Sequence, residues 1–216
     1  MKKRLLVIGG HGSGEIAMSV FQAMNEVTNE WEIEGFLNDI IQPGKYLGRY
    51  KVIGSSEEIV DYVNKGYFIH YTYHLNAKHK LERVKTFESL NIPLEANATG
   101  IHPNASMDNS TEIGYGCLIC SQAATSFGPK LGNFIHIYTN GFIGHDTWIG
   151  DYSTITAHSV IGARVRINTG AHIGLNASIR EDIKIGKYSI VGMGSVVVRN
   201  VDDFSIVVGN PAKKIK

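Results

Sequence analysis

Several features that often decide what a protein does are scarce in this chain of 216 residues. Two cysteines are too few for a disulfide framework. A formal net charge of +1 gives no electrostatic reason to expect nucleic acid or an anionic membrane as a partner. No apolar run approaches the roughly 18 to 20 residues that a bilayer crossing needs. We therefore expect a cytoplasmic protein with no nucleic-acid partner and no membrane insertion.

The two cysteines, Cys117 and Cys120, form a C-x-x-C motif. A reactive thiolate in such a motif needs a stabilising environment such as a helix N-terminus. These two lie inside a regular six-residue repeat instead, so we assign them neither a redox role nor a metal.

Residues 1–95 alternate between apolar runs and helical patterns, which favours an α/β domain built from βαβ units around a parallel sheet of about four strands. Serines mark two helix starts, Ser13 before the first helix and Ser55 before the second. The expected strands are 4–8, 32–37 and 67–70, and the expected helices are 15–26, 56–64 and 78–90.

A strict six-residue period begins after Ala96 and defines a second domain, residues 96–198, followed by a tail, residues 199–216. Fifteen of the seventeen positions that keep the frame are Ile, Leu or Val, too many for chance. Glycine often follows the aliphatic residue, and a small side chain often stands four residues after it. The frame positions are Ile101, Met107, Ile113, Ile119, Thr125, Leu131, Ile137, Ile143, Ile149, Ile155, Ile161, Ile167, Ile173, Ile179, Ile185, Val191 and Val197.

A hexad is too long for a helical turn, so each one predicts a flat side of a coil that ends in a tight corner. Three hexads close one triangular coil, and the aliphatic side chains stack inward every 18 residues. We expect glycine or small residues at the corners. Charge is sparse between residues 109 and 163, which indicates that flat faces of this β-helix are buried between subunits.

Two further motifs give the chain a family resemblance. One is the segment from Gly144 to Asp151, which contains His145 and Asp146, and the other is the ending Gly209-Asn210-Pro211-Ala212-Lys213. Together with the glycine-rich start Gly9-Gly10-His11-Gly12-Ser13-Gly14, they make the chain resemble the hexapeptide-repeat sugar acetyltransferases. That family includes sialic acid O-acetyltransferase and the bacillosamine, viosamine and perosamine N-acetyltransferases. The resemblance implies a left-handed parallel β-helix that works as a trimer.

His145 matches the catalytic base of this family. An amine or hydroxyl that attacks a thioester must lose a proton, and imidazole is suited to accept it near neutral pH. Asp146 matches the neighbouring acid that orients the imidazole. Adjacent residues in a strand normally point to opposite faces, so the role of Asp146 depends on the local backbone.

Two other histidines suggest zinc. His136 and His172 are 36 residues apart, two full coils, an interval that γ-class carbonic anhydrases use for zinc ligands. The third ligand of that class would fall at Ala177, so we predict no metal. His158 shares a column with Asn140 and Asn176 on an exposed or substrate-lining surface.

The resemblance also implies acetyl-CoA as acyl donor, bound in a groove between adjacent β-helices. The positions that match the family's contacts are Thr154, Leu175 and Met193, with the backbone amide of Ala163 near the thioester carbonyl as an oxyanion donor. Lys213, with the rest of the tail, is placed to meet the nucleotide phosphates.

In the family, the N-terminal domain holds the nucleotide of a sugar nucleotide. The glycine loop is not a dinucleotide fingerprint, because Glu15 stands where the third glycine belongs and its carboxylate would repel a pyrophosphate. The family's usual segment after the third strand is replaced here by residues 71–76, which leaves the base, uracil, thymine or guanine, open. The matching substrate positions are Gly10, His11, Gly12, Ser13, Asn38 and Asp39.

The chain is therefore expected to be an acetyl-CoA-dependent N-acetyltransferase acting on a nucleotide-linked 4-amino-6-deoxysugar in surface glycan biosynthesis. Transfer would be direct, because no cysteine or serine is placed beside His145 as a nucleophile. O-acetylation of sialic acid or a related sugar stays open as an alternative. A non-catalytic β-helix that binds a sugar nucleotide is the alternative from another class.

Overall fold

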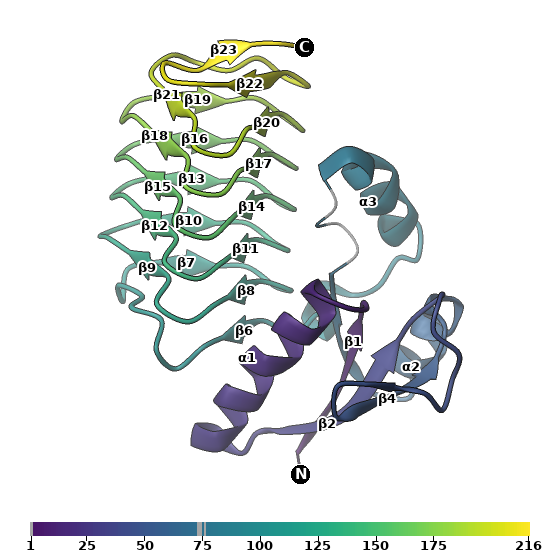
Figure 1. Cartoon of the computed structure of the whole chain (residues 1–216). Helices are drawn as coiled ribbons and strands as arrows, with labels where there is room; N and C mark the ends of the chain where they lie inside the picture. The colour runs from purple at the N-terminus through teal and green to yellow at the C-terminus, as the bar shows by residue number, and fades with distance from the viewer. Residues whose placement is uncertain (1, 73–74, 76) are drawn as a thin grey trace. The chain divides into compact units, whose positions relative to one another are not determined.

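A computed structural model describes residues 2–72, 75 and 77–216, which form two compact units, 1–103 and 104–216. Figure 1 traces both units, and each is described by itself. The elements of the first unit are β1 (Lys3–Ile8), α1 (Ser13–Thr28), β2 (Trp31–Leu37), β3 (Tyr46–Leu47), β4 (Tyr50–Gly54), η1 (Ser56–Glu58), α2 (Ile59–Asn64), β5 (Phe68–Tyr71), η3 (Ala77–His79), α3 (Lys80–Glu88), η4 (Leu94–Ala96) and β6 (Gly100–Ile101).

The sheet of the first unit has five strands in the order β3-β4-β2-β1-β5. Strands β4, β2, β1 and β5 run parallel, and β3 pairs antiparallel with β4. The predicted α/β domain is confirmed. The sequence pattern missed the β3–β4 hairpin, because its first strand has only two residues and too short a pattern to read.

Helix α1 begins one residue earlier than the serine signal implies. Ser13 is the first helical residue, and Gly12 occupies the capping position with φ 79°. Glycine has no side chain to cap a helix, so the Glu15 carboxylate accepts the Gly12 N–H instead, at 3.1 Å. The second signal is correct, since the Ser55 N–H donates to Glu58 at 2.7 Å just before η1.

The second unit is a parallel β-helix with three faces. Face 1 consists of β7 (Glu112–Ile113), β10 (Lys130–Leu131), β13 (Trp148–Ile149), β16 (Arg166–Ile167) and β19 (Lys184–Ile185). Face 2 includes β8 (Leu118–Ile119), β11 (His136–Ile137), β14 (Thr154–Ile155), β17 (His172–Ile173), β20 (Ile190–Val191), β22 (Ile206–Val208) and β23 (Lys213–Lys214). Face 3 consists of β9 (Ala124–Thr125), β12 (Phe142–Ile143), β15 (Val160–Ile161), β18 (Ser178–Ile179) and β21 (Val196–Val197).

The register is the one that the hexads predict. Ile137 pairs with Ile155 and Ile155 with Ile173, each 18 residues apart. All three side chains are fully buried. The inward aliphatic columns therefore form the core of the β-helix, and their burial provides the main favourable free energy of its folding.

The corners differ from the prediction of glycine or small residues. At every sixth position from Gly116 to Gly194 the backbone is left-handed, with φ between 49° and 77°. Phe134, Tyr152 and Arg164 stand at such corners although left-handed backbone costs a non-glycine residue roughly 1–2 kcal/mol. Contacts between successive corners offset that cost, since the Phe134 and Tyr152 rings stack at 4.7 Å with an interplanar angle of 1°.

Glycine after the aliphatic residue serves close approach and not the corner itself. A Cβ on Gly144 would lie 2.6 Å from the carbonyl carbon of Gly162 and 2.7 Å from the nitrogen of Ala163, both in the next coil. Coils spaced as neighbouring strands leave no room for that atom.

The corners form three columns with different chemistry. The aromatic edge, between faces 1 and 2, contains Phe134, Tyr152 and Tyr188. The amide edge, between faces 2 and 3, contains Gln122, Asn140, His158 and Asn176. The charged edge, between faces 3 and 1, contains Asp146, Arg164 and Asp182.

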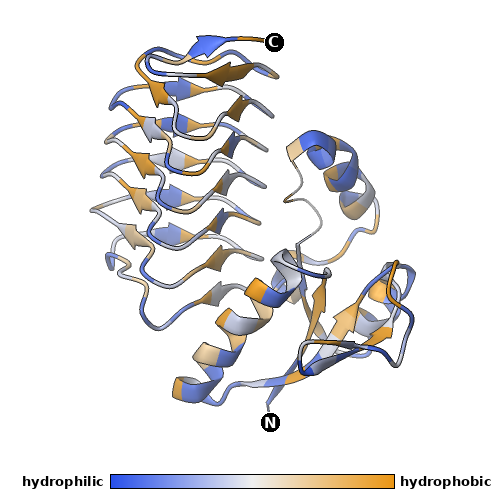
Figure 2. Ribbon diagram, viewed as in Figure 1, coloured by the Kyte–Doolittle hydropathy of each residue, from blue (hydrophilic) through white to orange (hydrophobic). Residues whose placement is uncertain are grey.

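The three faces differ as well. The outward residues of face 1 include Glu112, Lys130, Arg166 and Lys184. Those of face 3 are all uncharged, namely Ala124, Phe142, Val160, Ser178 and Val196. In Figure 2 the strands of face 3 are mostly orange, whereas those of face 1 carry blue segments. In the described part of the chain, no helix has the length and apolar character that a membrane crossing requires.

Candidate functional site

His145 and Asp146 lie together at the charged edge. His145 follows the buried Ile143 by two residues, and Asp146 takes the left-handed corner conformation with φ 55°. The corner breaks the strand alternation that would have sent the two side chains apart. Nδ1 of His145 is 2.8 Å from Oδ2 of Asp146, and about half of each side chain is exposed.

This contact has a direct chemical consequence. A carboxylate only accepts hydrogen bonds, so Nδ1 of His145 carries the proton in this pair. Nε2 then keeps its lone pair and is the nitrogen that can remove a proton from another group.

The next two coils extend the charged edge. Arg164 stands one coil beyond Asp146, and its guanidinium binds Asp182 through two contacts of 2.8 Å each. That hydrogen-bonded pairing holds the pKa of Asp182 below its usual value. The Arg164 N–H also donates to the His145 carbonyl at 2.8 Å. The sequence pattern did not single out Arg164 and Asp182, although their spacing of 18 and 36 residues from Asp146 is the available signal.

Ala163 lies one coil beyond His145 on the same edge. Its backbone N–H donates to no group among the residues that the structure describes. The structure thus brings His145, Asp146 and Ala163 together, as an acyl-transfer site requires of a base and an oxyanion donor.

The other predicted cofactor positions lie elsewhere on the β-helix. Leu175 and Met193 are 18 residues apart beside the amide edge and are 47% and 75% exposed. Thr154 is buried on β14 of face 2. Lys213 is exposed on β23, which pairs antiparallel with β22. Within one chain, face 3 separates the amide edge from the charged edge.

His136, Thr154 and His172 stack in one column on β11, β14 and β17, as their spacing predicts. The position of the absent third zinc ligand, Ala177, is fully buried. Among the described residues there is no group of three or more His, Cys, Asp or Glu side chains that could hold a metal ion.

The two thiols are also enclosed. Burial raises the pKa of Cys117 to about 12 and that of Cys120 to about 11. The nucleophilic thiolate form is therefore disfavoured at both positions.

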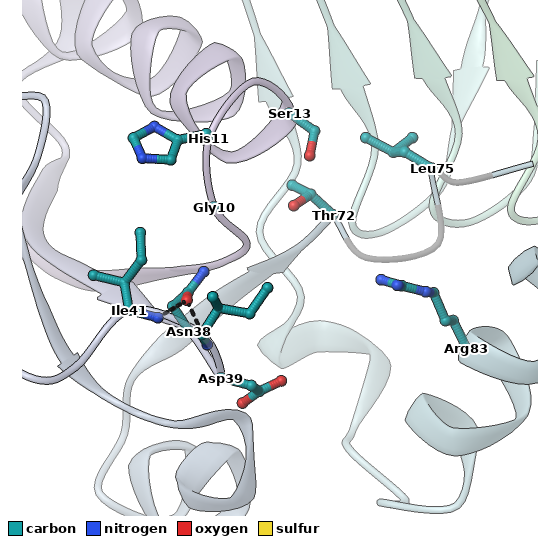
Figure 3. Close-up of a pocket in the computed structure, with 10 residues that line it drawn as sticks. Gly10, His11, Ser13, Asn38, Asp39, Ile41, Thr72, Leu75 and Arg83 are labelled. Carbon is teal, nitrogen blue, oxygen red and sulfur yellow. Dashed lines mark hydrogen bonds between the residues drawn. The ribbon is translucent and has the colours of Figure 1, made fainter.

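The first unit contains a cavity of about 540 Å³ at the carboxyl ends of its parallel strands. Five of the six predicted substrate residues line it, namely Gly10, His11, Ser13, Asn38 and Asp39, with Ile40, Ile41, Thr72, Leu75 and Arg83. Figure 3 shows these side chains around the cavity. Gly12 does not line it.

Asn38 holds the cavity wall together. Its Nδ2 donates to the Gly9 carbonyl at 2.9 Å, and its Oδ1 accepts the N–H groups of Ile40 and Ile41 at 2.9 and 2.7 Å (Figure 3). The side chain is only 5% exposed. A Cβ on Gly10 would lie 2.8 Å from Nδ2, so glycine is needed for the loop to approach this amide.

Arg83 is a cavity residue that the sequence motifs did not reveal. It comes from α3, and its carbonyl accepts a hydrogen bond from the Tyr71 hydroxyl at 3.1 Å. The available signal was its helical spacing, because it stands three residues after Lys80 and four before Phe87, both buried. Of the departing segment 71–76, Thr72 and Leu75 line the cavity, and Tyr73, His74 and Asn76 lie outside the described residues.

These features define a protein with a ligand-sized cavity in an α/β unit and a histidine–carboxylate pair on a parallel β-helix. No protein-family model matches the sequence. No curated protein matches it either. Solved structures do match over almost the whole chain, and three of them are described next.

The acetyltransferase domain of PglB from Neisseria gonorrhoeae FA1090 is 24% identical, with a TM-score of 0.86 over 99% of this chain and 100% of that one. WeeI from Acinetobacter baumannii AYE is 25% identical, with a TM-score of 0.83 over 99% and 100%. PerB from Caulobacter crescentus, solved in complex with CoA and GDP-perosamine, is 21% identical, with a TM-score of 0.84 over 98% and 97%. This likeness confirms the predicted fold, a small α/β unit followed by a left-handed parallel β-helix.

Proposed function

We propose that this protein transfers an acetyl group from acetyl-CoA to the amine of a nucleotide-linked 4-amino-6-deoxysugar. The observation that carries the proposal is the His145–Asp146 contact of 2.8 Å on the charged edge. A histidine with a fixed tautomer is what the attack of an amine on a thioester requires. Surface glycan assembly is the expected use of such a product.

The proposed step balances as follows. Nε2 of His145 removes a proton from the amine while its nitrogen forms a bond to the thioester carbon. The carbon–sulfur bond breaks, and CoA leaves as the thiol. The Ala163 N–H stabilises the negative charge that develops on the carbonyl oxygen. Asp146 keeps Nδ1 protonated and so stabilises the imidazolium that forms.

The cavity of the first unit supports a nucleotide-linked acceptor. Backbone N–H groups of the glycine loop at the start of α1 suit phosphate, because a helix N-terminus favours negative charge. Two similar structures agree with this proposal, since PerB was solved with CoA and GDP-perosamine and the PglB domain with acetyl coenzyme A.

We also propose a trimer with the site between neighbouring subunits. Face 3 supports it, because its outward residues carry no charge and Phe142 and Val160 are 40% and 47% exposed. The separation of Leu175 and Met193 from His145 supports it further. A groove between two subunits would unite the amide edge of one chain with the charged edge of the next.

The test is product analysis after incubation with acetyl-CoA and UDP-, dTDP- and GDP-linked 4-amino sugars, with sialic acid included. We expect free thiol and an acetylated sugar nucleotide whose new bond resists mild alkali, because an amide is more stable to it than an ester. An alkali-labile product would make the protein an O-acetyltransferase. Nucleotide binding without thiol release from any acceptor would make it a binding protein.

A further inference from the structure

A second cavity, of about 340 Å³, adjoins the first in the α/β unit. It is lined by Asp39, Ser56, Glu57, Ile59, Tyr71, Arg83, Thr86, Phe87 and Leu90. Asp39 and Arg83 line both cavities. A ligand that fills the first cavity therefore meets the second at these two side chains.

One wall of the second cavity is apolar and rigid. The rings of Tyr71 and Phe87 stack at 4.0 Å with an interplanar angle of 12°, and both residues are 4% exposed. Ile59 and Leu90 add aliphatic surface. The Tyr71 hydroxyl bond to the Arg83 carbonyl ties α3 to β5 and fixes this wall. Such a surface suits a flat ring system.

The polar groups of the second cavity have a distinct pattern. Asp39 and Glu57 are carboxylates, which only accept hydrogen bonds, and Arg83 only donates them. The Asp39 carboxylate is positioned because Oδ1 accepts the Ser56 N–H at 2.7 Å. A ring bound here should present hydrogen-bond donors toward the carboxylates and acceptors toward the guanidinium.

Guanine presents this combination. Its N1–H and 2-amino groups are adjacent donors that a carboxylate accepts together, and its O6 and N7 are the acceptors that arginine recognises. Uracil and thymine have a single N–H between two carbonyl oxygens, which a carboxylate would repel. Adenine lacks the oxygen acceptor and has only its 6-amino group as an exocyclic donor.

We propose that the second cavity binds the guanine base of a GDP-linked sugar. This inference rests on the proposed function, because it places the phosphates and sugar in the first cavity. It adds the base that the sequence left open, and the residues that select it, Asp39, Glu57 and Arg83.

Calorimetric titration of the full chain with GDP, UDP, dTDP and ADP tests the inference. We expect GDP to bind at least tenfold more tightly than the other three. Asp39→Asn keeps an oxygen that accepts the Ser56 N–H but removes the charge, so it should reduce the preference for GDP at least fivefold. Arg83→Met should weaken GDP more than UDP.

Matched controls are Glu88→Gln and Lys85→Met, two exposed positions of α3 outside both cavities. Both should bind GDP like the unaltered chain. Equal or tighter binding of UDP or dTDP would overturn the guanine assignment and leave the nucleotide function standing. Binding of none of the four nucleotides would overturn the proposed acceptor class, and with it the guanine assignment. An unchanged GDP preference in Asp39→Asn would overturn the selecting role of that residue.

Discussion

Single residues at the corners of the β-helix determine how its side chains are presented. Asp146 shows this most clearly, because its left-handed backbone lets its carboxylate reach the preceding imidazole. Asparagine tolerates this conformation better than alanine does. It is therefore the substitution that separates the charge of Asp146 from its backbone role.

We expect Asp146→Asn to lower turnover about tenfold, which corresponds to about 1.4 kcal/mol of lost transition-state stabilisation. The amide oxygen still accepts the Nδ1 proton of His145 but no longer supplies a negative charge to the imidazolium. The KM for acetyl-CoA and the Tm should stay unchanged. A fall in Tm, or unchanged turnover, would speak against an electrostatic role.

His70 gives the α/β unit a pH dependence. It is fully buried, its Nδ1 is 2.9 Å from the Ala98 carbonyl oxygen, and burial lowers its pKa from 6.5 to about 4. The unfolded chain therefore binds a proton near pH 6.5 that the folded chain refuses until about pH 4. Stability at neutral pH should decline as the pH falls through this window, by about 3 kcal/mol in all.

Urea unfolding between pH 7.5 and 4.5 measures this decline. In His70→Asn the amide Nδ2 stands near the position of Nδ1 but does not titrate, so the variant should lose most of the slope. Equal slopes in the two proteins would contradict the assignment to His70.

At the scale of elements, stacked corners stabilise the β-helix in addition to its core. Phe134 and Tyr152 are 3% and 5% exposed and their rings are parallel. Replacing each by asparagine, singly and together, gives a double-mutant cycle without added backbone strain. We expect a coupling free energy of about 1 kcal/mol in urea unfolding. Additive effects of the two changes would show that the stack contributes nothing.

The elements also show what the sequence could reveal. The hexads specified the register, because an inward aliphatic residue recurs wherever a flat side must bury it, and so they placed His136, Thr154 and His172 in one column. Periodicity carried no information on the corners, where Tyr152 and Arg164 stand in place of small residues. Arg83 escaped notice because it approaches Asp39 only through the packing of α3 on the sheet.

At the scale of the whole molecule, the uncharged face 3 predicts the oligomeric state. We expect sedimentation to show a trimer. A carboxylate in a buried subunit contact has no partner, so Val160→Glu should give monomers. Arg166→Glu, on the charged face 1, is the matched control and should remain trimeric. A trimeric Val160→Glu variant would exclude face 3 as the contact surface.

The most direct test of acetyl transfer compares thiol release by the unaltered chain and by His145→Ala, with acetyl-CoA and a nucleotide-linked 4-amino sugar. We predict that the substitution lowers turnover at least roughly a hundredfold, the usual contribution of a general base, while the Kd for CoA stays the same. Turnover by His145→Ala close to that of the unaltered chain would contradict the proposed mechanism.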